Sequence, residues 1–364
     1  MPAELYVGLM SGTSLDGVDA TLVRFETGTL RCLATHYLPY PSEIRQEALA
    51  IQTSGTDELR RAAFLGNRLA DIYAVTTREL LAKANVAASS VRAIGCHGQT
   101  VRHAPADGYT LQLNNPARLA EKAGISVITD FRSRDIAAGG QGAPLVPACH
   151  DALFRTPYGH RVIVNVGGVA NLTNLAPSIP TGGFDCGPGN MLLDAWIDQC
   201  LGTPYDEGGR WAKQGRILPE LLARLRNHPF FAAPPPKSCG REEFGSAWLD
   251  NLLDGDETPA DVQATLVALT ATTIADAITR WCGNPTEVFV CGGGAHNAIL
   301  MEALACALTA STIATTDALG FPADWVEAVA FAWLAYRTIH GLSGNLPEVT
   351  GAGGPRVLGA IYPA

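Results

Sequence analysis

Near the start of the chain stands the stretch Gly8-Leu9-Met10-Ser11-Gly12-Thr13-Ser14-Leu15-Asp16-Gly17-Val18-Asp19. The apolar residues on either side, 5–10 and 18–25, predict two strands, and the small polar residues between them predict a turn. Small residues let backbone N–H groups approach an anion, and the hydroxyl groups add donors. We therefore predict a hairpin whose turn, residues 12–19, binds phosphate. The alternative is an ordinary hairpin turn that contains Ser and Thr.

Two further glycine turns occur later. Asn165-Val166-Gly167-Gly168-Val169-Ala170-Asn171 predicts a second strand-turn-strand unit, and Cys291-Gly292-Gly293-Gly294-Ala295-His296-Asn297 follows a predicted strand, 287–291, and precedes a helix. The first turn is not a P-loop, because no Lys follows it and a strand comes next. The last turn lacks the third glycine of a dinucleotide fingerprint, which argues against a Rossmann nicotinamide site.

The order of predicted elements is that of an α/β protein. Antiparallel strands come first, then helices at 42–52 and 57–83, strands at 91–96, 109–113 and 125–131, and a helix at 115–124. After the Gly-rich residues 137–142 the pattern begins again with strands at 161–166 and 170–175. Helices are predicted at 190–201, 258–281 and 322–340. The chain therefore consists of two α/β halves, each of which opens with a glycine-bearing hairpin.

Composition narrows the function classes. The 364 residues suffice for about two domains, and 47% hydrophobic against 17% charged residues excludes global disorder. The net charge of −9 provides no basic field for nucleic acid. Nine scattered cysteines without a CxxC motif favour reduced thiols in a cytoplasm. The strongest apolar run, 328–336, is far shorter than the roughly 20 residues that span a bilayer, and no signal peptide is apparent, so we expect no membrane partner.

Taken in order, the three turns resemble those of the sugar kinase, actin and Hsp70 superfamily, in which two hairpin loops bind the ATP phosphates and a late Gly-rich turn binds the adenosine. Within this superfamily the whole chain resembles the anhydro-N-acetylmuramic acid kinase family. The segments that carry the resemblance are GLMSGTSLDGVD (8–19), CHGQT (96–100), DFRSRDIAAGGQGAPLVP (130–147), NVGGVANLT (165–173), GFDCGPGN (183–190), KSCGREEF (237–244), CGGGAHN (291–297) and PADWVEAVAFAWLA (322–335).

The resemblance implies a two-lobed actin-like, duplicated ribonuclease H-like fold with a central cleft. Residues 1–135 and 342–364 would form one lobe and 136–341 the other. It implies a cytoplasmic homodimer that uses ATP and Mg²⁺ to open the 1,6-anhydro ring of 1,6-anhydro-N-acetylmuramic acid with water and to phosphorylate O6. The product would be N-acetylmuramic acid 6-phosphate, in recycling of cell-wall sugar.

Two carboxylates are the catalytic candidates. Asp185 is expected on a turn between a strand and a helix, where it can take a proton from a nucleophile. By resemblance it is the base that activates water; the alternative is that it caps the next helix, although Asn190 can supply that cap. Glu327 is expected in the first turn of a helix, where the dipole alone favours a carboxylate. Its catalytic role rests on the resemblance.

Other candidates concern the ligands. Asp16 and Asp19 follow the first turn and suit Mg²⁺, directly or through water, although one of them could serve only to stabilise the turn. Among Arg132, Arg134 and Asp135, an Arg can pair with the lactyl carboxylate of a muramic sugar, and we choose Arg134; a surface ion pair is the alternative. His97 ends a strand and is expected near the sugar or as a hydrogen-bonded structural residue. No metal site made by protein ligands is predicted.

Two rival functions remain. A nucleotide-dependent switch protein of the actin or Hsp70 type would share the phosphate hairpins, but it has no need of the segments 183–190 and 130–144. A glycoside hydrolase could use Asp185 and Glu327 as paired carboxylates. That function leaves the phosphate turns unexplained.

Overall fold

The computed structural model describes residues 3–12, 14–26, 28–240 and 243–364. The chain forms two compact units, the first made of Met1–Leu153 and Trp325–Ala364 and the second of Phe154–Asp324. The sequence prediction had placed residues 136–153 and 325–341 with the second lobe; in the structure they belong to unit 1.

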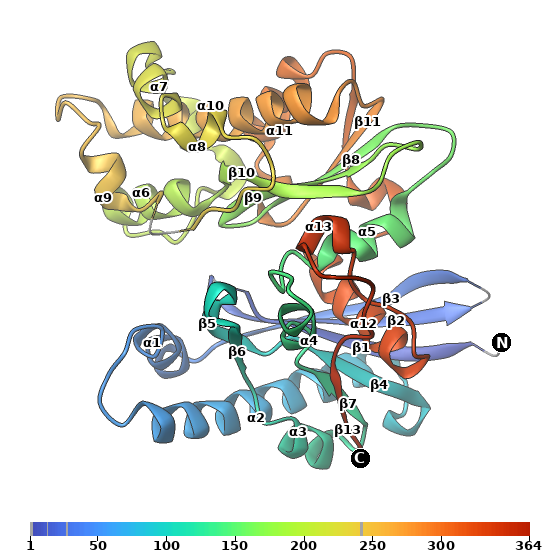
Figure 1. Ribbon diagram of the computed structural model, residues 1–364. Coiled ribbons are helices and arrows are strands. Elements are labelled where there is room, and N and C mark those ends of the chain that lie inside the picture. Colours follow the sequence, from blue (N-terminus) through green and yellow to red (C-terminus); the bar gives the residue numbers. More distant parts are fainter. Residues whose placement is uncertain (1–2, 13, 27, 241–242) are drawn as a thin grey trace. The chain divides into compact units, whose positions relative to one another are not determined.

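Unit 1 is built on a six-stranded sheet in the order β13-β7-β4-β1-β2-β3 (Figure 1). The first three strands of the chain are antiparallel, while β4 and β7 run parallel to β1 and to each other. The strands are β1 (Glu4–Met10), β2 (Gly17–Glu26), β3 (Thr29–Pro39), β4 (Val91–Cys96), β7 (Val127–Thr129) and β13 (Ala360–Tyr362), and β5 (Gln99–Ala104) and β6 (Tyr109–Leu113) form a separate ribbon. The helices are α1 (Ser42–Ala50), α2 (Glu58–Ala84), α3 (Pro116–Ala123), α4 (Ser133–Ala137), α5 (Val146–Phe154), α12 (Val326–Ile339) and α13 (Pro347–Thr350).

The position of α12 explains the corrected boundary. Val7 and Leu9 of β1 are buried in one cluster with Leu69 and Tyr73 of α2. Gly8 faces the other way, because neighbouring strand residues point to opposite sides of a sheet. A Cβ at Gly8 would lie 1.9 Å from the Ala328 carbonyl oxygen of α12. The helix therefore packs directly on the backbone of the first sheet, and it brings Glu327 into unit 1.

Unit 2 has a five-stranded sheet in the order β10-β9-β8-β11-β12 (Figure 1). Its strands are β8 (Arg161–Val166), β9 (Val169–Leu175), β10 (Gly182–Pro188), β11 (Glu287–Cys291) and β12 (Thr312–Thr315). Its helices are α6 (Met191–Leu201), α7 (Pro219–Arg226), α8 (Pro229–Ala232), α9 (Ser246–Asp250), α10 (Pro259–Ala277) and α11 (Ala298–Ala307), and a π-helical turn, Ile278–Cys282, continues α10.

The two sheets have the same topology. When the strands of each sheet are numbered in chain order, leaving out the β5–β6 ribbon, both sheets have the order third-second-first-fourth-fifth. In both, the first three strands are antiparallel and the last two run parallel to the first. In unit 1, β13 is added beyond the fifth strand, β7. The prediction of an α/β protein made of two related ribonuclease H-like halves is therefore confirmed.

Helix α10 with its π-helical continuation, Pro259–Cys282, is long and apolar enough to cross a membrane. However, 83% of its most apolar window is buried inside the protein. Its apolar character is thus accounted for by packing in the core of this unit.

Candidate active site

The first predicted phosphate turn joins β1 to β2 in unit 1. Leu15 has a left-handed backbone, φ +58°, with its side chain buried. The exposed Ser14 hydroxyl donates to the Asp16 carboxylate at 2.7 Å. A Cβ at Gly12 would meet no atom closer than 3.7 Å, so packing does not demand glycine there. Gly17, in contrast, lies against the Leu38 carbonyl oxygen. Gly17, Val18 and Asp19 begin β2, and Thr13 lies outside the described residues.

A buried polar network holds this turn in place. The Ser11 hydroxyl hydrogen-bonds the Tyr73 hydroxyl at 2.8 Å and donates to the Gly98 carbonyl oxygen at 3.1 Å. The Gln99 amide donates to the Gly12 carbonyl oxygen at 3.0 Å. Because the partners come from α2 and from the CHGQT segment, the turn is fixed by residues distant in sequence. Sequence reasoning missed this network, since a buried Tyr hydroxyl has no periodic signature.

The second and third glycine turns come together in unit 2. The Gly167 and Gly168 carbonyl oxygens accept backbone N–H groups of Asn190 and Gly189 at 2.8 and 2.9 Å. A Cβ at Gly294 would lie 2.3 Å from Val166 Cγ1, and one at Gly292 2.4 Å from Asn165 Oδ1. Gly293 begins a short 3-10 turn before α11. The close packing of these two turns accounts for glycine at 292 and 294 and leaves Gly167 and Gly168 open.

Asp185 is in a strand, whereas the sequence predicted a turn. It lies in β10, the edge strand of the second sheet, where the pairing with β9 shifts register between Asp185 and Gly187. Such a bulge inserts an extra residue and re-aims the side chain next to it. Asp185 Oδ2 accepts the Cys239 N–H at 3.1 Å. Burial is the main cause that raises the pKa of Asp185 to about 6, and the Cys239 hydrogen bond opposes it.

Neither Asp185 nor Asn190 caps α6 with its side chain. Asp185 bonds the segment after α8, and α6 begins only at Met191. Asn190 makes no side-chain cap either, because its amide donates to the Val166 carbonyl oxygen at 3.1 Å. The Asn190 side chain therefore ties α6 to the second glycine turn.

Glu327 belongs to a partly buried polar group in unit 1 that contains Arg132 and the buried His97. Burial raises its pKa and the charge of Arg132 lowers it. Arg132 donates to His97 Nε2 at 2.9 Å from Nη2 and to the Gly142 carbonyl oxygen at 2.8 Å. Burial lowers the pKa of Arg132 to about 10, which leaves it cationic at neutral pH.

His97 is neutral at neutral pH, because burial and then Arg132 lower its pKa to about 3. Since Arg132 donates to Nε2, the ring proton is on Nδ1, which donates to the Ser11 carbonyl oxygen at 3.2 Å. Both ring nitrogens of His97 are thus used inside unit 1. Arg134, the chosen sugar ligand, is exposed on α4, and it is Arg132 that the structure places with Glu327 and His97.

The metal candidates are both near Tyr37. Burial is the main cause that raises the pKa of Tyr37, and the charges of Asp16 and Asp19 add to the rise. Among the described residues, no group of three or more His, Cys, Asp or Glu side chains could hold a metal ion. A cation at this turn would therefore need ligands beyond the protein side chains.

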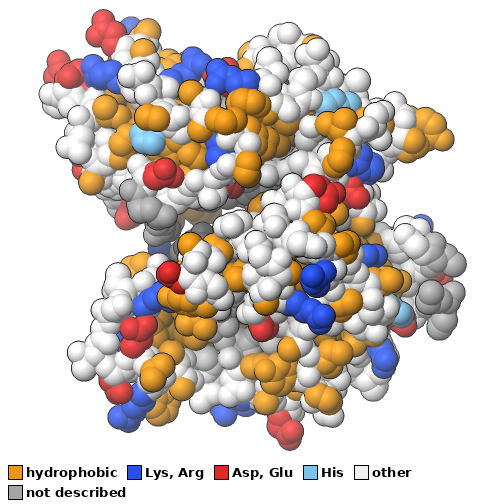
Figure 2. Space-filling model, viewed as in Figure 1, with side chains coloured by type: hydrophobic (Ala, Val, Ile, Leu, Met, Phe, Trp, Pro, Cys, Tyr) orange, Lys and Arg blue, Asp and Glu red, His pale blue; other side chains and the backbone are white. Residues whose placement is uncertain are grey.

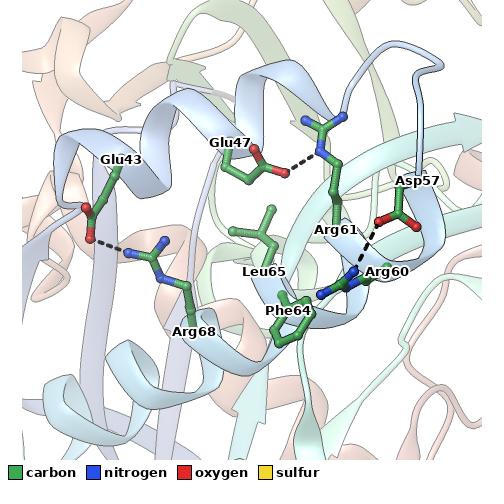
Figure 3. Close-up of a pocket in the computed structure, with 8 residues that line it drawn as sticks. All are labelled: Glu43, Glu47, Asp57, Arg60, Arg61, Phe64, Leu65 and Arg68. Atoms are coloured by element: carbon green, nitrogen blue, oxygen red, sulfur yellow. Dashed lines mark hydrogen bonds and ion pairs between the residues drawn. The ribbon is translucent and has the colours of Figure 1, made fainter.

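Two surface hollows contain none of the candidates. A pocket of about 390 Å³ between α1 and α2 is rimmed by the pairs Arg68–Glu43, Arg61–Glu47 and Arg60–Asp57 (Figure 3). A hollow of about 890 Å³ in unit 2 is lined by α7, α8 and the end of α10, and Figure 2 shows Lys and Arg side chains beside hydrophobic ones on this unit.

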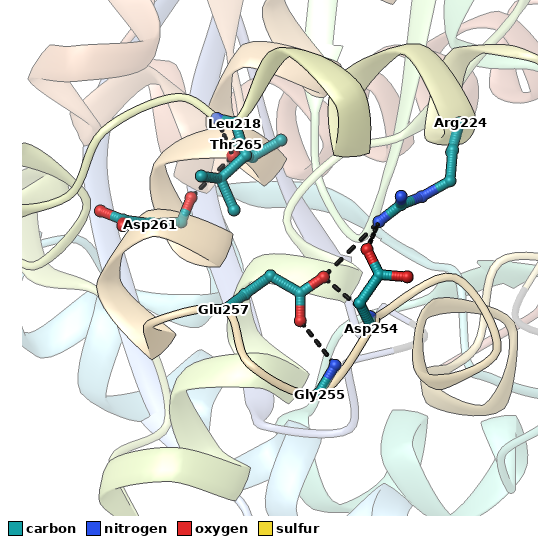
Figure 4. A network of polar contacts seen from close by, with 7 residues as sticks. All are labelled: Leu218, Arg224, Asp254, Gly255, Glu257, Asp261 and Thr265. Carbon is teal, nitrogen blue, oxygen red and sulfur yellow. Dashed lines mark hydrogen bonds and ion pairs between the residues drawn. The ribbon is translucent and has the colours of Figure 1, made fainter.

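The loop before α10 is held by its own polar network (Figure 4). Arg224 pairs with Asp254 at 2.8 Å, and Glu257 accepts the backbone N–H groups of Asp254 and Gly255, each at 2.8 Å. These contacts tie the loop to α7, which indicates a structural role.

Comparison with known proteins decides the family. The sequence profile described as "Anhydro-N-acetylmuramic acid kinase" matches residues 4–364. The chain is 56% identical to the anhydro-N-acetylmuramic acid kinase of Nitrosospira multiformis, with 100% of both chains covered, and 54% identical to that of Chromobacterium violaceum, with 99% of both covered. The chain belongs to the anhydro-N-acetylmuramic acid kinase family.

Among solved structures, the activator of the 2-hydroxyisocaproyl-CoA dehydratase from Clostridium difficile is similar with a TM-score of 0.47 and 15% identity, over 91% of this chain and 94% of that one. The predicted membership of the anhydro-N-acetylmuramic acid kinase family is confirmed by the sequence relatives alone. With it the prediction of a sugar-kinase enzyme is confirmed, and the switch protein and the hydrolase are not favoured.

Proposed function

We propose that this chain catalyses the ATP-dependent opening and phosphorylation of 1,6-anhydro-N-acetylmuramic acid. The observation that carries the proposal is the full-length match to enzymes of that name. Water adds at C1, the C1–O6 bond breaks, and O6 takes the γ-phosphoryl group of ATP. The products are N-acetylmuramic acid 6-phosphate, ADP and a proton, within recycling of cell-wall sugar.

In this proposal Asp185 is the general base. A carboxylate with a pKa of about 6 is ionised at neutral pH and is a stronger base than an exposed aspartate. It removes the proton of the attacking water as the C1–O bond forms. Glu327 is the second catalytic carboxylate, and Arg132 keeps a positive charge near it. Arg134 and His97 remain the proposed sugar ligands, although the contacts of His97 favour an indirect role through Arg132.

The nucleotide is proposed to contact all three glycine turns. Residues 12–19 and Gly167-Gly168 present backbone N–H groups to the phosphates, and Gly292, Gly293 and Gly294 contact the adenosine. The open surface at Gly12, Gly167 and Gly168 supports this assignment. Mg²⁺ fits Asp16 and Asp19, because it commonly takes one or two carboxylates and completes its shell with phosphate oxygens and water. When bound, it neutralises phosphate charge.

We also propose, from the family resemblance, that the protein is a cytoplasmic homodimer. Light scattering after size-exclusion chromatography measures the oligomeric state. A mass near the 38.3 kDa of one chain would refute the dimer.

The decisive test is an ADP-release assay with 1,6-anhydro-N-acetylmuramic acid, and with free N-acetylmuramic acid and glucose as controls. ADP is expected with the anhydro sugar only, because an open sugar already has its C1 hydroxyl. In ¹⁸O-labelled water the label should enter C1 and be absent from the phosphate. Equal turnover of the open sugar would make the protein an ordinary hexose kinase.

A further inference from the structure

The segment after α8 folds over the strand that carries Asp185. Gly187, next to the bulge in β10, has φ +143°. A Cβ there would lie 2.7 Å from Phe231 Cε1, so the aromatic ring of α8 rests directly on the strand backbone. Phe231 in turn stacks on the buried Phe244 at 5.4 Å between ring centroids. The α8 turn is thus anchored to β10 by an aromatic contact that only glycine permits.

Lys237 closes the loop that begins at α8. Its ammonium group donates to the carbonyl oxygens of Phe230 at 2.9 Å and Phe231 at 3.4 Å. The same nitrogen lies 4.6 Å from the centroid of the Phe230 ring. These contacts satisfy carbonyl groups at the end of a one-turn helix and fix the side chain of Lys237 against α8.

The backbone of the same segment bonds to Asp185 at two points. The Lys237 carbonyl oxygen accepts the Asp185 N–H at 3.1 Å. The Cys239 N–H donates to Asp185 Oδ2 at 3.1 Å. Residues 237–239 therefore pair with the free edge of β10, and they orient the carboxylate through the backbone alone.

We propose that Lys237 is a positioning residue for Asp185: by closing the α8 loop, its ammonium group holds the 237–239 backbone in the place that aims the carboxylate. The inference rests on the proposed role of Asp185 as general base. Lys237 acts through the segment, since its own ammonium group is engaged with the carbonyl oxygens of α8. A side chain without the donor would remove both bonds from Lys237 to α8, leaving the Phe230 carbonyl oxygen with only the Ala233 N–H, and would loosen both bonds to Asp185.

The charges around Asp185 give the test a second readout. Glu243 raises the pKa of Asp185 and Lys237 lowers it, while the thiols of Cys186 and Cys239 are also close to Asp185 and Lys237. Burial is the main cause that lowers the pKa of Lys237, and the charge of Arg280 lowers it further. Removal of the Lys237 charge should therefore raise the pKa of Asp185 and move the acid limb of the rate profile to higher pH.

The experiment compares Lys237→Met with Lys237→Gln in the full-length enzyme, with Lys213→Met, an exposed lysine of the same unit, as the matched control. The Met variant loses both charge and donor, so kcat should fall about 10- to 100-fold, as expected when a catalytic group is misplaced by about 1 Å. KM for the sugar should change much less. The Gln variant keeps an N–H donor for the carbonyl oxygens, so it should retain more kcat than the Met variant. In both variants the acid limb should move to higher pH.

Three outcomes overturn the inference: a folded Met variant with normal kcat, equal kcat losses in the Met and Gln variants, or a loss of kcat that follows a lower Tm with an unmoved acid limb. If the Met variant does not fold, the acid limb of the Gln variant decides. Asp185→Asn separates the two proposals. Normal turnover of that variant would refute the proposed base, whereas an inactive Asn variant beside a normal Lys237→Met variant refutes only the positioning role.

Discussion

Asp185 and Glu327 are both carboxylates whose pKa is raised by burial, but their surroundings compensate the charge differently. Asp185 receives a backbone N–H on an edge strand. Glu327 lies at the start of a helix near the guanidinium group of Arg132. The Cys239 N–H offsets only part of the burial of Asp185, whose pKa stays at about 6, whereas the full positive charge of Arg132 opposes the rise that burial causes in the pKa of Glu327. From this comparison we propose that Asp185 transfers the proton and that Glu327 acts through its charge.

The largest effect should come from Asp185→Asn. The amide keeps the size and the hydrogen bond from Cys239 but cannot accept a proton, so kcat should fall about 10²- to 10⁴-fold. ADP release and sugar opening, measured in parallel, should fall together. Near-normal turnover would transfer the role of base to Glu327 and reverse the comparison.

Next in size is the effect of Arg132→Met on stability. The change removes the donors to His97 and Gly142 and the positive charge near Glu327, which should lower the free energy of unfolding by about 2–4 kcal/mol. Urea denaturation at pH 7 measures the loss. Arg134→Met is the matched control, because that side chain is exposed, and it should change stability by less than about 0.5 kcal/mol.

A smaller effect is expected from Glu327→Gln. If the carboxylate acts by charge alone, kcat should fall about tenfold and the acid limb set by Asp185 should keep its position near pH 6. The rate should decrease below that pH, because the base becomes protonated. An acid limb that disappears in the Gln variant would mean that Glu327 is the titrating group.

The last effect concerns the stability that the folded protein loses because the Asp185 carboxylate is buried. Since the folded-state pKa of Asp185, about 6, exceeds the ordinary 3.8, the native state binds the proton more tightly and loses stability as pH rises from about 4 to above 6. Asp185→Asn should therefore unfold with a free energy up to about 3 kcal/mol higher than the parent at pH 8, and without most of this gain at pH 4. Thermal unfolding at both pH values measures the difference. An equal gain at both would point to packing instead of charge.

The sequence predicted the strands and helix ends that local patterns determine, and it missed the features that depend on contacts between segments distant in the chain. Alternating apolar strands, the Pro116 helix start and the Gly124 helix end are local signals, and the structure has them. Asp185 was expected on a turn, because glycines at 183, 187 and 189 obscure the strand β10. The group of Arg132, His97 and Glu327 requires three segments to meet, and no local pattern encodes such a meeting. The lobe boundaries failed for the same reason, since only packing shows that α12 lies on β1 and β4.

The division of unit 1 into two sequence segments has a consequence for protein synthesis. Unit 2 is continuous, so all of its residues are synthesised before Trp325–Ala364, the second segment of unit 1. Unit 1 cannot complete its packing until its second segment is made, because α12 covers β1 and because Asn345 and Thr350 donate to the buried Asp135 at 2.7 and 2.8 Å. The first 153 residues are therefore synthesised first, but their packing is completed last. Until α12 is made, they expose the apolar face that it covers, and transiently exposed apolar surface of this kind is prone to aggregation.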